Sequence, residues 1–361
     1  MKILFDCRYT RIGHHDGISR FTAELVRALA ERHEVVMLIS DPRQREMLPD
    51  LPWHRISAPT SVREPFVALQ VNALAPDIVF SPMQTMGSFG RRYRLMLTVH
   101  DLIYYRYPTP PRNLPAFVRA LWRIYHLWWW PQRFLLNRAD AVAAVSRTTS
   151  DLIAQHRLTK RPVFLVSNAS AFASLSEGAA ERLEPETKSL VYMGSFMPYK
   201  NVDTLVRAMA ALPDYELHLL SAVSSAEQDR LRALARHARL VFHQGVSDEK
   251  YREILLSARA LVSASRDEGF GIPLVESMGL GTPVVVSDIP IFREIGGDAA
   301  HYFPADEPDE LAKRVRELEE PGVWVHSSHE SRLQASHYTW ESSAADLLAA
   351  LADTVDAANA P

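Results

Sequence analysis

Two glutamates, Glu268 and Glu276, are separated by seven residues in a segment suited to binding a polyhydroxylated ligand. The segment reads SRDEGFGIPLVESMGLGTPVVV over residues 265–286 and follows a short apolar run at 260–263. Carboxylates accept hydrogen bonds from hydroxyl groups, so two of them at this spacing can hold two separate parts of one ligand. Taken singly, Glu276 could equally complement a helix dipole and Glu268 could be solvated.

The residues between the two glutamates predict a loop that leads into a helix. Gly269 and Gly271 let the backbone approach a ligand without obstruction by a Cβ atom. Pro273 suits the first helical position, and the N-terminal N–H groups of that helix would point at the ligand. We therefore expect Glu268 in the loop and Glu276 in the first turn of the helix.

A second segment could bind phosphate groups. It reads YMGSFMPYKNVD over residues 192–203 and begins at the end of an apolar run. Gly194 permits a tight turn from strand to loop, and Lys200 can place a point charge beside a diphosphate. A loop lysine is often only a solvated surface charge, so this interpretation depends on the other segments.

A third segment, RIGHHDGISRF over residues 11–21, follows the first apolar run of the chain. Gly13 and Gly17 flank a loop that opens a helix starting near Ser19, and such a turn is a general anion site. The spacing is not that of the dinucleotide fingerprint GxGxxG, which disfavours NAD binding. Residues 14–16 could instead form an exposed loop tip.

The fourth segment, His100-Asp101-Leu102, ends the apolar run at 95–99. A histidine at a strand end is more often structural than functional, although its imidazole could contact a sugar. Asp101 could bind a ligand or cap the next turn.

Short apolar, β-branched runs alternate with amphipathic stretches along the whole chain. The runs are continuous, as is typical of strands buried on both faces of a parallel sheet. Amphipathic helices are expected between them, for example at 21–32, where Phe21, Leu25 and Leu29 share one face. The expected strands cover residues 3–5, 35–39, 78–80, 95–99, 141–145 and 163–166, then 190–193, 216–220, 240–242, 260–263, 283–287 and 301–303.

This order predicts an α/β protein of two doubly wound, Rossmann-like domains facing a central cleft. The polar, aperiodic stretch 174–188 is interpreted as the linker. The expected domains are 1–175 and 187–339, and a last helix within 340–361 could pack back on the first domain. Ligands of such sheets bind at the carboxyl ends of the strands, which is where the four segments lie.

Composition narrows the class of protein. The 361 residues, 47% of them hydrophobic, can bury two cores. A net charge of −3 gives no reason to expect a nucleic-acid partner. A single cysteine and the lack of a signal-peptide core or a long apolar span predict a cytoplasmic protein. No cluster of His, Cys and acidic residues has metal-ligand spacing, and no Asp-x-Asp ends a strand, so neither a metal nor another cofactor is expected.

Together the segments resemble the retaining glycosyltransferases of family 4 (glycosyl transferases group 1), which have the GT-B fold, and within them the mannosyltransferase-like branch. Matching segments run in the family's order from about Gly13 to Glu294. The resemblance implies a hexosyltransferase that uses a nucleotide-sugar donor. The resemblance places Glu268 and His100 at the donor sugar and Lys200 at the leaving diphosphate. It implies that the nucleotide and its phosphates are bound by Gly13, Gly17, Gly194, Ser195, Gly245, Gly269, Phe270, Gly271 and Glu276, with Glu276 on the ribose. Further sugar or acceptor contacts would come from Arg20, Asp101 and Ser146.

One departure from the family concerns the phosphate loop. Many members carry an arginine beside the glycine or before the lysine, where this chain has Ser195 and Tyr199. Arg266 or Arg20 could take its place. The resemblance also implies metal-independent transfer with retention of configuration. It favours GDP-mannose over UDP-sugars as donor, and a glycan, a lipid-linked saccharide or a polyol as acceptor.

Two other functions are compatible with the same fold. A GT-B-fold sugar-nucleotide 2-epimerase is the alternative, although it gives no reason for the paired-glutamate helix. A non-catalytic sugar-binding protein is the third candidate, although it would not need Lys200 at a phosphate.

Residues 115–138, PAFVRALWRIYHLWWWPQRFLLNR, combine tryptophans with arginines. The stretch could be a buried helix whose arginines reach solvent. It could also be an amphipathic helix that lies in a membrane interface and gives peripheral contact with the cytoplasmic face of the inner membrane.

Overall fold

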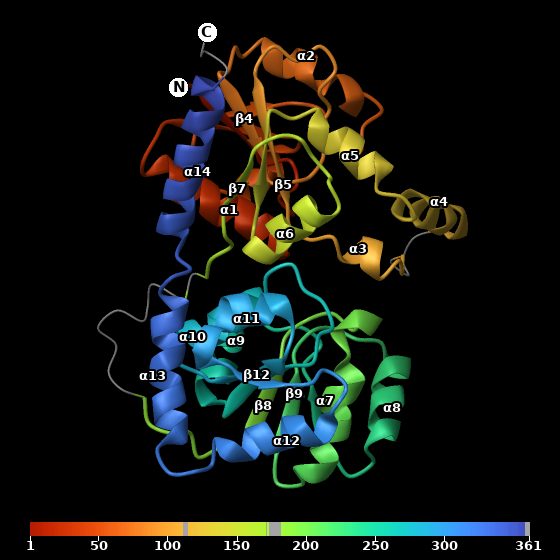
Figure 1. The fold of residues 1–361 in the computed structure, drawn as a ribbon, viewed down its shortest axis with the longest axis vertical. Helices are drawn as coiled ribbons and strands as arrows, with labels where there is room; N and C mark the ends of the chain where they lie inside the picture. Colours follow the sequence, from red (N-terminus) through yellow and green to blue (C-terminus); the bar gives the residue numbers. More distant parts are fainter. Residues whose placement is uncertain (111–114, 171, 173–181, 358–361) are drawn as a thin grey trace. The chain divides into compact units, whose positions relative to one another are not determined.

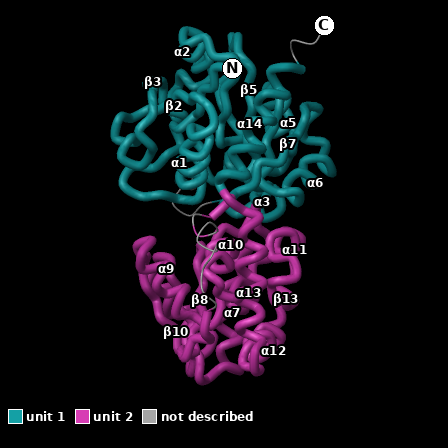
Figure 2. The backbone as a smooth tube through the Cα atoms, turned by 90° about the vertical axis from the view of Figure 1, so that its left-hand side faces the viewer, with its two compact units in different colours: residues 1–168, 340–361 teal, residues 169–339 magenta. Residues whose placement is uncertain are grey.

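The computed structural model describes residues 1–110, 115–170, 172 and 182–357. The chain divides into two compact units, each coloured separately in Figure 2. Unit 1 comprises Met1–Asn168 and Trp340–Pro361, and unit 2 comprises Ala169–Thr339. The chain therefore passes between the units twice.

Unit 1 is built on a sheet that has seven parallel strands among the described residues, in the order β3-β2-β1-β4-β5-β6-β7. Its central strands are buried on both faces, which is why they appear as continuous apolar runs. Every strand predicted for this half is present, with ends that differ by at most one residue. The strands are β1 Ile3–Asp6, β2 Val35–Ile39, β3 Trp53–Arg55, β4 Ile78–Ser81, β5 Arg94–Val99, β6 Ala141–Ala144 and β7 Val163–Leu165.

Helix α14 returns to unit 1 and packs against α1, as Figure 1 shows. The ring of Trp340 meets that of Phe21 edge-on at 5.9 Å. Helix α1 begins at Gly17, two residues before the predicted start, because the Asp16 carboxylate accepts a hydrogen bond from the Ser19 N–H (2.9 Å). The helices of unit 1 are α1 Gly17–Ala30, α2 Val67–Asn72, α3 Ile103–Arg106, α4 Ala116–His126, α5 Trp130–Asn137, α6 Arg147–Gln155 and α14 Trp340–Asp356.

Unit 2 repeats this design on a sheet of six parallel strands, counted over its described residues, in the order β10-β9-β8-β11-β12-β13. Its predicted strands are again present to within one residue. The strands are β8 Ser189–Tyr192, β9 Glu216–Leu219, β10 Arg239–Phe242, β11 Ala260–Ser263, β12 Val284–Ser287 and β13 His301–Phe303; the helices are α7 Val202–Ala208, α8 Ser225–Leu234, α9 Asp248–Ser257, α10 Ile272–Gly279, α11 Pro290–Gly296, α12 Pro308–Glu317 and α13 Val323–Ala335. Short 3-10 helices occur at Pro42–Met47, Glu64–Phe66, Pro198–Lys200, Met209–Ala211 and Gly297–Ala299.

The end of the predicted linker is packed on unit 2, while residues 174–181 of it lie outside the described part of the chain. The Arg182 guanidinium donates to the carbonyl of Leu280 (2.9 Å) and lies 5.1 Å from the ring of Trp324. Trp324 is fully buried, and its indole N–H donates to the carbonyl of Arg259 (2.8 Å).

The aromatic stretch 115–138 forms two helices, α4 and α5, with apolar side chains on its outside. Phe117 is 69% exposed, and Leu121 and Ile124 are each 61% exposed. The interpretation of this stretch as a buried helix is therefore wrong. Of the helices described, none has both the length and the apolar composition needed to cross a bilayer.

Candidate active site

Lys200 is held at the carboxyl edge of the unit 2 sheet by the 3-10 turn Pro198–Lys200, which follows β8. Its backbone N–H donates to the carbonyl of Met197 (2.9 Å). The next residue, Asn201, has a left-handed backbone (φ 53°), and its side-chain amide donates to the carbonyl of Ala305 (2.7 Å). These contacts fix the backbone from which the lysine side chain extends.

Glu268 comes from the loop after β11, the strand that pairs with β8. Its Oε1 atom accepts hydrogen bonds from Lys200 Nζ (2.5 Å) and from Ser265 Oγ (2.8 Å). The two loops are also joined through the backbone, because the N–H of Arg266 donates to the carbonyl of Tyr199 (2.8 Å). The lysine and glutamate side chains are 16% and 13% exposed, so they form a largely buried ion pair.

Helix α10 starts directly beside this ion pair. Gly271 is its N-cap with φ +101°, and a Cβ atom there would lie 3.1 Å from the ring of Phe292. Both the backbone angle and the close approach therefore favour glycine. Because the helix begins at Ile272, Glu276 is its fifth residue and lies in the second turn. The prediction that Glu276 lies in the first turn is therefore wrong. Its side chain is largely buried, with 9% exposed.

One small pocket brings together three of the predicted residues, Lys200, Glu268 and Gly271. A lysine, a carboxylate and a helix N-terminus next to one another suit a ligand that has phosphate groups beside hydroxyls. Glu276 does not line this pocket. The remaining lining residues are Met193, Leu261, Val262, Ser263, Pro273, Leu274 and Phe292.

The side chain of Tyr192 leaves no room for a Cβ atom at Gly194. A Cβ atom on Gly194 would lie 2.7 Å from the hydroxyl oxygen of Tyr192. That hydroxyl donates to the carbonyl of Ser195 (2.6 Å), and burial raises the pKa of the Tyr192 phenol. The Ser195 backbone is thus tied down while the residue itself is exposed.

The other predicted nucleotide contacts of unit 2 are in different surroundings. Gly245 follows β10 with φ +99°, and a Cβ atom there would meet nothing within 4 Å. Phe270 is buried and packs edge-on against Tyr338 at 5.6 Å, so it belongs to the core under the loop. Gly269 is partly exposed beside it.

Arg266, a candidate for the missing phosphate-binding arginine, extends from the same loop as Glu268. Its guanidinium donates to the carboxylate of Asp306 (2.5 Å) and to the carbonyl of Pro198 (3.1 Å). The hydrogen bond from Arg266 lowers the pKa of Asp306. Arg266 therefore stands beside the turn that carries Lys200. The second candidate, Arg20, lies in unit 1 in the first turn of α1.

In unit 1, His100 follows β5 and is hydrogen-bonded through one ring nitrogen. Its Nε2 is 2.7 Å from the carbonyl oxygen of Pro82, and a carbonyl can only accept. Nε2 therefore carries a hydrogen, and in the neutral form of the ring Nδ1 is an acceptor. The ring packs edge-on against Phe21 (4.9 Å), and burial lowers the pKa of the imidazole.

Two predicted contacts of unit 1 have local structural roles. Asp101 Oδ1 accepts a hydrogen bond from the N–H of Ile103 (3.1 Å), so it caps the turn that follows, the role that the sequence left open. Ser146 is fully buried and is the N-cap of α6, where its Oγ accepts from the N–H of Thr149 (3.0 Å).

The glycine loop before α1 is braced by its own side chains. Gly13 has φ +80°, and a Cβ atom there would meet nothing within 4 Å. The Arg11 guanidinium donates to Asp16 (2.7 Å), while Gly17 is the first residue of the helix. The stretch 14–16 is therefore not simply a loop tip, because Asp16 is the cap of α1.

One cluster at the same edge of the unit 1 sheet was missed in the sequence. Arg8 is 3% exposed and donates to both oxygens of Asp6, the last residue of β1 (2.8 and 3.0 Å). It also donates to Glu64 (2.6 Å). The available signal was a charged residue that ends an apolar strand, followed two positions later by an arginine.

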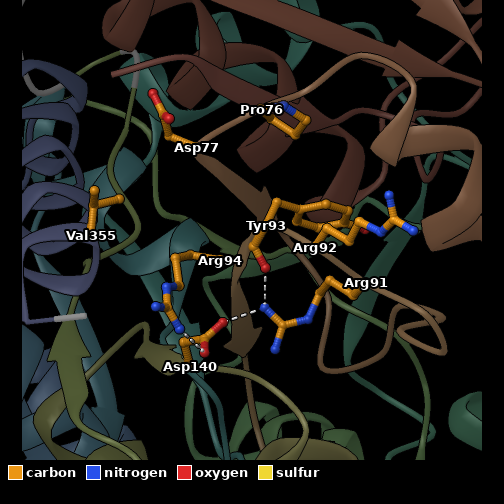
Figure 3. Close-up of a pocket in the computed structure, with 8 residues that line it drawn as sticks. All are labelled: Pro76, Asp77, Arg91, Arg92, Tyr93, Arg94, Asp140 and Val355. Carbon is orange, nitrogen blue, oxygen red and sulfur yellow. Dashed lines mark hydrogen bonds and ion pairs between the residues drawn. The ribbon is translucent and has the colours of Figure 1, made fainter. Parts of the chain in front are cut away.

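A larger pocket of unit 1 lies at the opposite edge of the sheet. Figure 3 shows Arg91 and Arg94 converging on Asp140, which precedes β6. Burial alone would raise the pKa of Asp140, but hydrogen bonds from Arg91 and from the Leu95 N–H lower it. These groups pair with one another at the amino ends of β5 and β6, away from the predicted residues. Among the described residues of the whole chain, no group of three or more His, Cys, Asp or Glu is arranged to hold a metal ion.

Both halves of the chain match profiles of glycosyltransferase families. Residues 15–169 match Glycosyltransferase Family 4, and residues 177–338 match Glycosyl transferases group 1. A serotype-specific mannosyltransferase, WbdA of Escherichia coli, is 26% identical over 302 residues, which cover 76% of this chain and 35% of that protein. The chain thus spans about a third of the length of the first curated relatives that it matches.

Solved structures share the fold over nearly the whole chain. Sucrose-phosphate synthase from Thermosynechococcus elongatus has a TM-score of 0.71 at 19% identity and covers 99% of this chain and 100% of that one. Anabaena HepE, solved in complex with UDP-glucose, has a TM-score of 0.67 at 18% identity and covers 97% of this chain and 100% of that one. The predicted α/β fold class, two Rossmann-like sheets of the GT-B type, is confirmed. The chain belongs to the glycosyltransferases, with a Family 4 half followed by a group 1 half.

Proposed function

We propose that this protein is a retaining hexosyltransferase that moves mannose from GDP-mannose to a glycan, a lipid-linked saccharide or a polyol. The observation that carries the proposal is the Lys200–Glu268 ion pair at the start of α10. It stands at the carboxyl edge of the unit 2 sheet, where open α/β sheets bind their ligands.

The ion pair suits the connectivity of a nucleotide-sugar. An ammonium group has three N–H donors, so Lys200 can keep its bond to Glu268 while it binds a phosphate oxygen. Lys200 and Ser265 both bond to Oε1 of Glu268, and Oε2 can accept hydrogen bonds from sugar hydroxyls. A sugar beside its diphosphate would then be held by one lysine–glutamate unit.

In the proposed reaction, the acceptor hydroxyl attacks the anomeric carbon on the face that the diphosphate leaves. The new C–O bond forms as the bond to the phosphate oxygen breaks, and that oxygen takes the hydroxyl proton. The positive charge of Lys200 stabilises the departing diphosphate, an effect worth about 10²–10³ in rate when one such donor is removed. No metal or other cofactor is proposed.

The remaining roles follow the same proposal. Glu276 would bind the ribose from the second turn of α10. His100 would accept a hydrogen bond from a sugar hydroxyl at Nδ1, because its Nε2 already donates to Pro82. Ser146 is proposed only as a secondary contact, since its hydroxyl caps α6.

The choice of mannose is supported by relatives that are named mannosyltransferases, including WbdA and the O-antigen chain mannosyltransferase RfbU of Salmonella typhimurium, which is 25% identical over 229 residues. A UDP-hexose is the second donor candidate, because HepE was solved with UDP-glucose. The reaction is proposed to take place in the cytoplasm.

Thermal unfolding with GDP-mannose, GDP, UDP-glucose and UDP, each with and without EDTA, tests the donor site. A ligand at 100 times its Kd should stabilise the chain by about 2.7 kcal/mol. Glu276→Gln should abolish that stabilisation. Glu253→Gln, at a 68% exposed glutamate of α9, is the matched control and should leave it unchanged.

Each result has a defined meaning. Stabilisation by GDP ligands alone, without metal, supports the mannose donor, and stabilisation by UDP ligands alone replaces it with a UDP-hexose. A normal response of Glu276→Gln refutes the donor site. Incubation of the protein with the stabilising nucleotide-sugar and acceptors then distinguishes the transferase from the epimerase. Conversion of the nucleotide-sugar to its 2-epimer without transfer indicates the epimerase. Binding without turnover indicates the sugar-binding protein.

A further inference from the structure

Helix α4 and the turn after it carry an outward-facing stripe of large apolar side chains. Phe117, Leu121, Ile124 and Trp128 follow one another at helical spacing and are 69, 61, 61 and 69% exposed. Leu127 and Trp130 extend the stripe and are 66 and 67% exposed. Figure 1 shows α4 projecting from the body of unit 1. We call these six residues the α4 apolar face.

The opposite side of the same segment is packed on unit 1. Trp122 meets the ring of Tyr104 edge-on at 5.0 Å. Trp129 stacks between Tyr105 (4.1 Å) and His156 (4.2 Å). These ring contacts orient the helix, so the exposure of its other side follows from packing. Six large apolar side chains exposed next to one another also differ from an ordinary protein surface, where such side chains are exposed singly.

The charge of this region is one-sided. Residues 102–138 contain no Asp and no Glu, although the whole chain has a net charge of −3. Arg123 and Arg133 are exposed. The six arginines of the region are Arg106, Arg112, Arg119, Arg123, Arg133 and Arg138.

We propose that the α4 apolar face docks on the surface of an anionic lipid bilayer, with its tryptophans and leucines in the interface and the exposed Arg123 and Arg133 on lipid phosphates. Tryptophan, aliphatic side chains and arginine around one helix are the composition that lies in such an interface. A second copy of the chain fits poorly, because a two-fold interface sets the same face against itself and would bring the arginines of both copies together. The inference goes beyond the proposed transfer, since it concerns binding without donor or acceptor.

Sedimentation of the full chain with lipid vesicles tests this proposal. Vesicles of phosphatidylcholine alone are compared with vesicles that also contain phosphatidylglycerol. The apolar variant combines Leu121→Ser, Ile124→Ser and Trp128→Ser, and the charge variant is Arg123→Gln. Matched controls are Leu69→Ser and Leu333→Ser, at leucines that are 56 and 51% exposed on α2 and α13, and Arg252→Gln on α9.

We expect binding to anionic vesicles and little to neutral ones. The apolar variant should lose at least tenfold in partitioning, and Arg123→Gln about fivefold. The controls should bind as the unchanged chain does, and all variants should keep its Tm because the substituted side chains are largely exposed. Binding that is absent, or that survives the apolar variant, would overturn the proposal. Self-association through this face in the absence of lipid would overturn it as well. Nucleotide-induced stabilisation, measured on the same variants, reports the donor site separately.

Discussion

Glu268→Gln removes the charge that balances Lys200 while keeping the shape of the side chain. Breaking a fully buried ion pair costs roughly 3–5 kcal/mol, and breaking an exposed one costs about 0.2–1 kcal/mol. The two side chains are 16% and 13% exposed, so we expect a loss of about 2 kcal/mol in the free energy of unfolding. In a domain of this size that lowers Tm by roughly 4–8 °C.

A double-mutant cycle isolates the pair from other effects of the substitutions. Glu268→Gln, Lys200→Met and the double variant are unfolded in urea without ligand, and the double variant should lose less stability than the sum of the two single ones. The expected coupling is about 2 kcal/mol. Lys250 and Glu253 of α9 provide a control pair of the same residue types in the same unit, 2.9 Å apart but 51% and 68% exposed. Their coupling should be about 0.3–0.5 kcal/mol.

A coupling for Lys200 and Glu268 no larger than that of the control pair would refute this reasoning. It would mean that the pair is effectively solvated. The proposal that one lysine–glutamate unit holds both the sugar and the diphosphate would then lose its basis.

Three further predictions concern stability. Burial lowers the pKa of four histidines, His100, His218, His243 and His301, so near pH 6.5 and below the unfolded chain binds more protons than the folded one. The free energy of unfolding, measured with urea at each pH, should therefore fall as pH decreases from about 7 to about 5.5, and a constant or rising value would contradict this. Gly271→Ala should lower the free energy of unfolding by about 2 kcal/mol, because it adds both backbone strain and a contact with Phe292, whereas Gly245→Ala, where a Cβ atom meets nothing, should lower it by only about 1 kcal/mol. Equal shifts in Tm would show that the contact with Phe292 adds nothing. Ser146→Ala should cost about 1 kcal/mol through loss of the α6 cap, and an unchanged Tm would show that the cap is not stabilising.

The strands were predictable because strands covered on both faces must be continuously apolar. Strand β3 was not, because Trp53–Arg55 is a short edge strand with one partly buried residue followed by two exposed ones. Such a strand needs no apolar run, and nothing in the three residues distinguishes it from a loop.

The site was predictable in its residue types and only partly in its geometry. The contact between Lys200 and Glu268 spans 68 residues and depends on β8 lying beside β11, an order that the local sequence does not specify. The turn that holds Glu276 depends on where α10 starts, which Gly271 sets through its positive φ. The apolar periodicity of α4 was visible, but periodicity cannot say whether a stripe faces a core or the solvent.

The return of α14 to unit 1 has a consequence for biosynthesis. The helix buries Leu347 and Leu351 in unit 1, yet these residues leave the ribosome after all of unit 2. Unit 2 is continuous in sequence and can complete its fold while the sheet of unit 1 still lacks one covering helix. Domains more often finish folding in order from the amino terminus, whereas unit 1 needs residues 340–356, which follow unit 2 in the sequence. A chain truncated after residue 339 should therefore contain a protease-resistant unit 2 and a protease-sensitive unit 1.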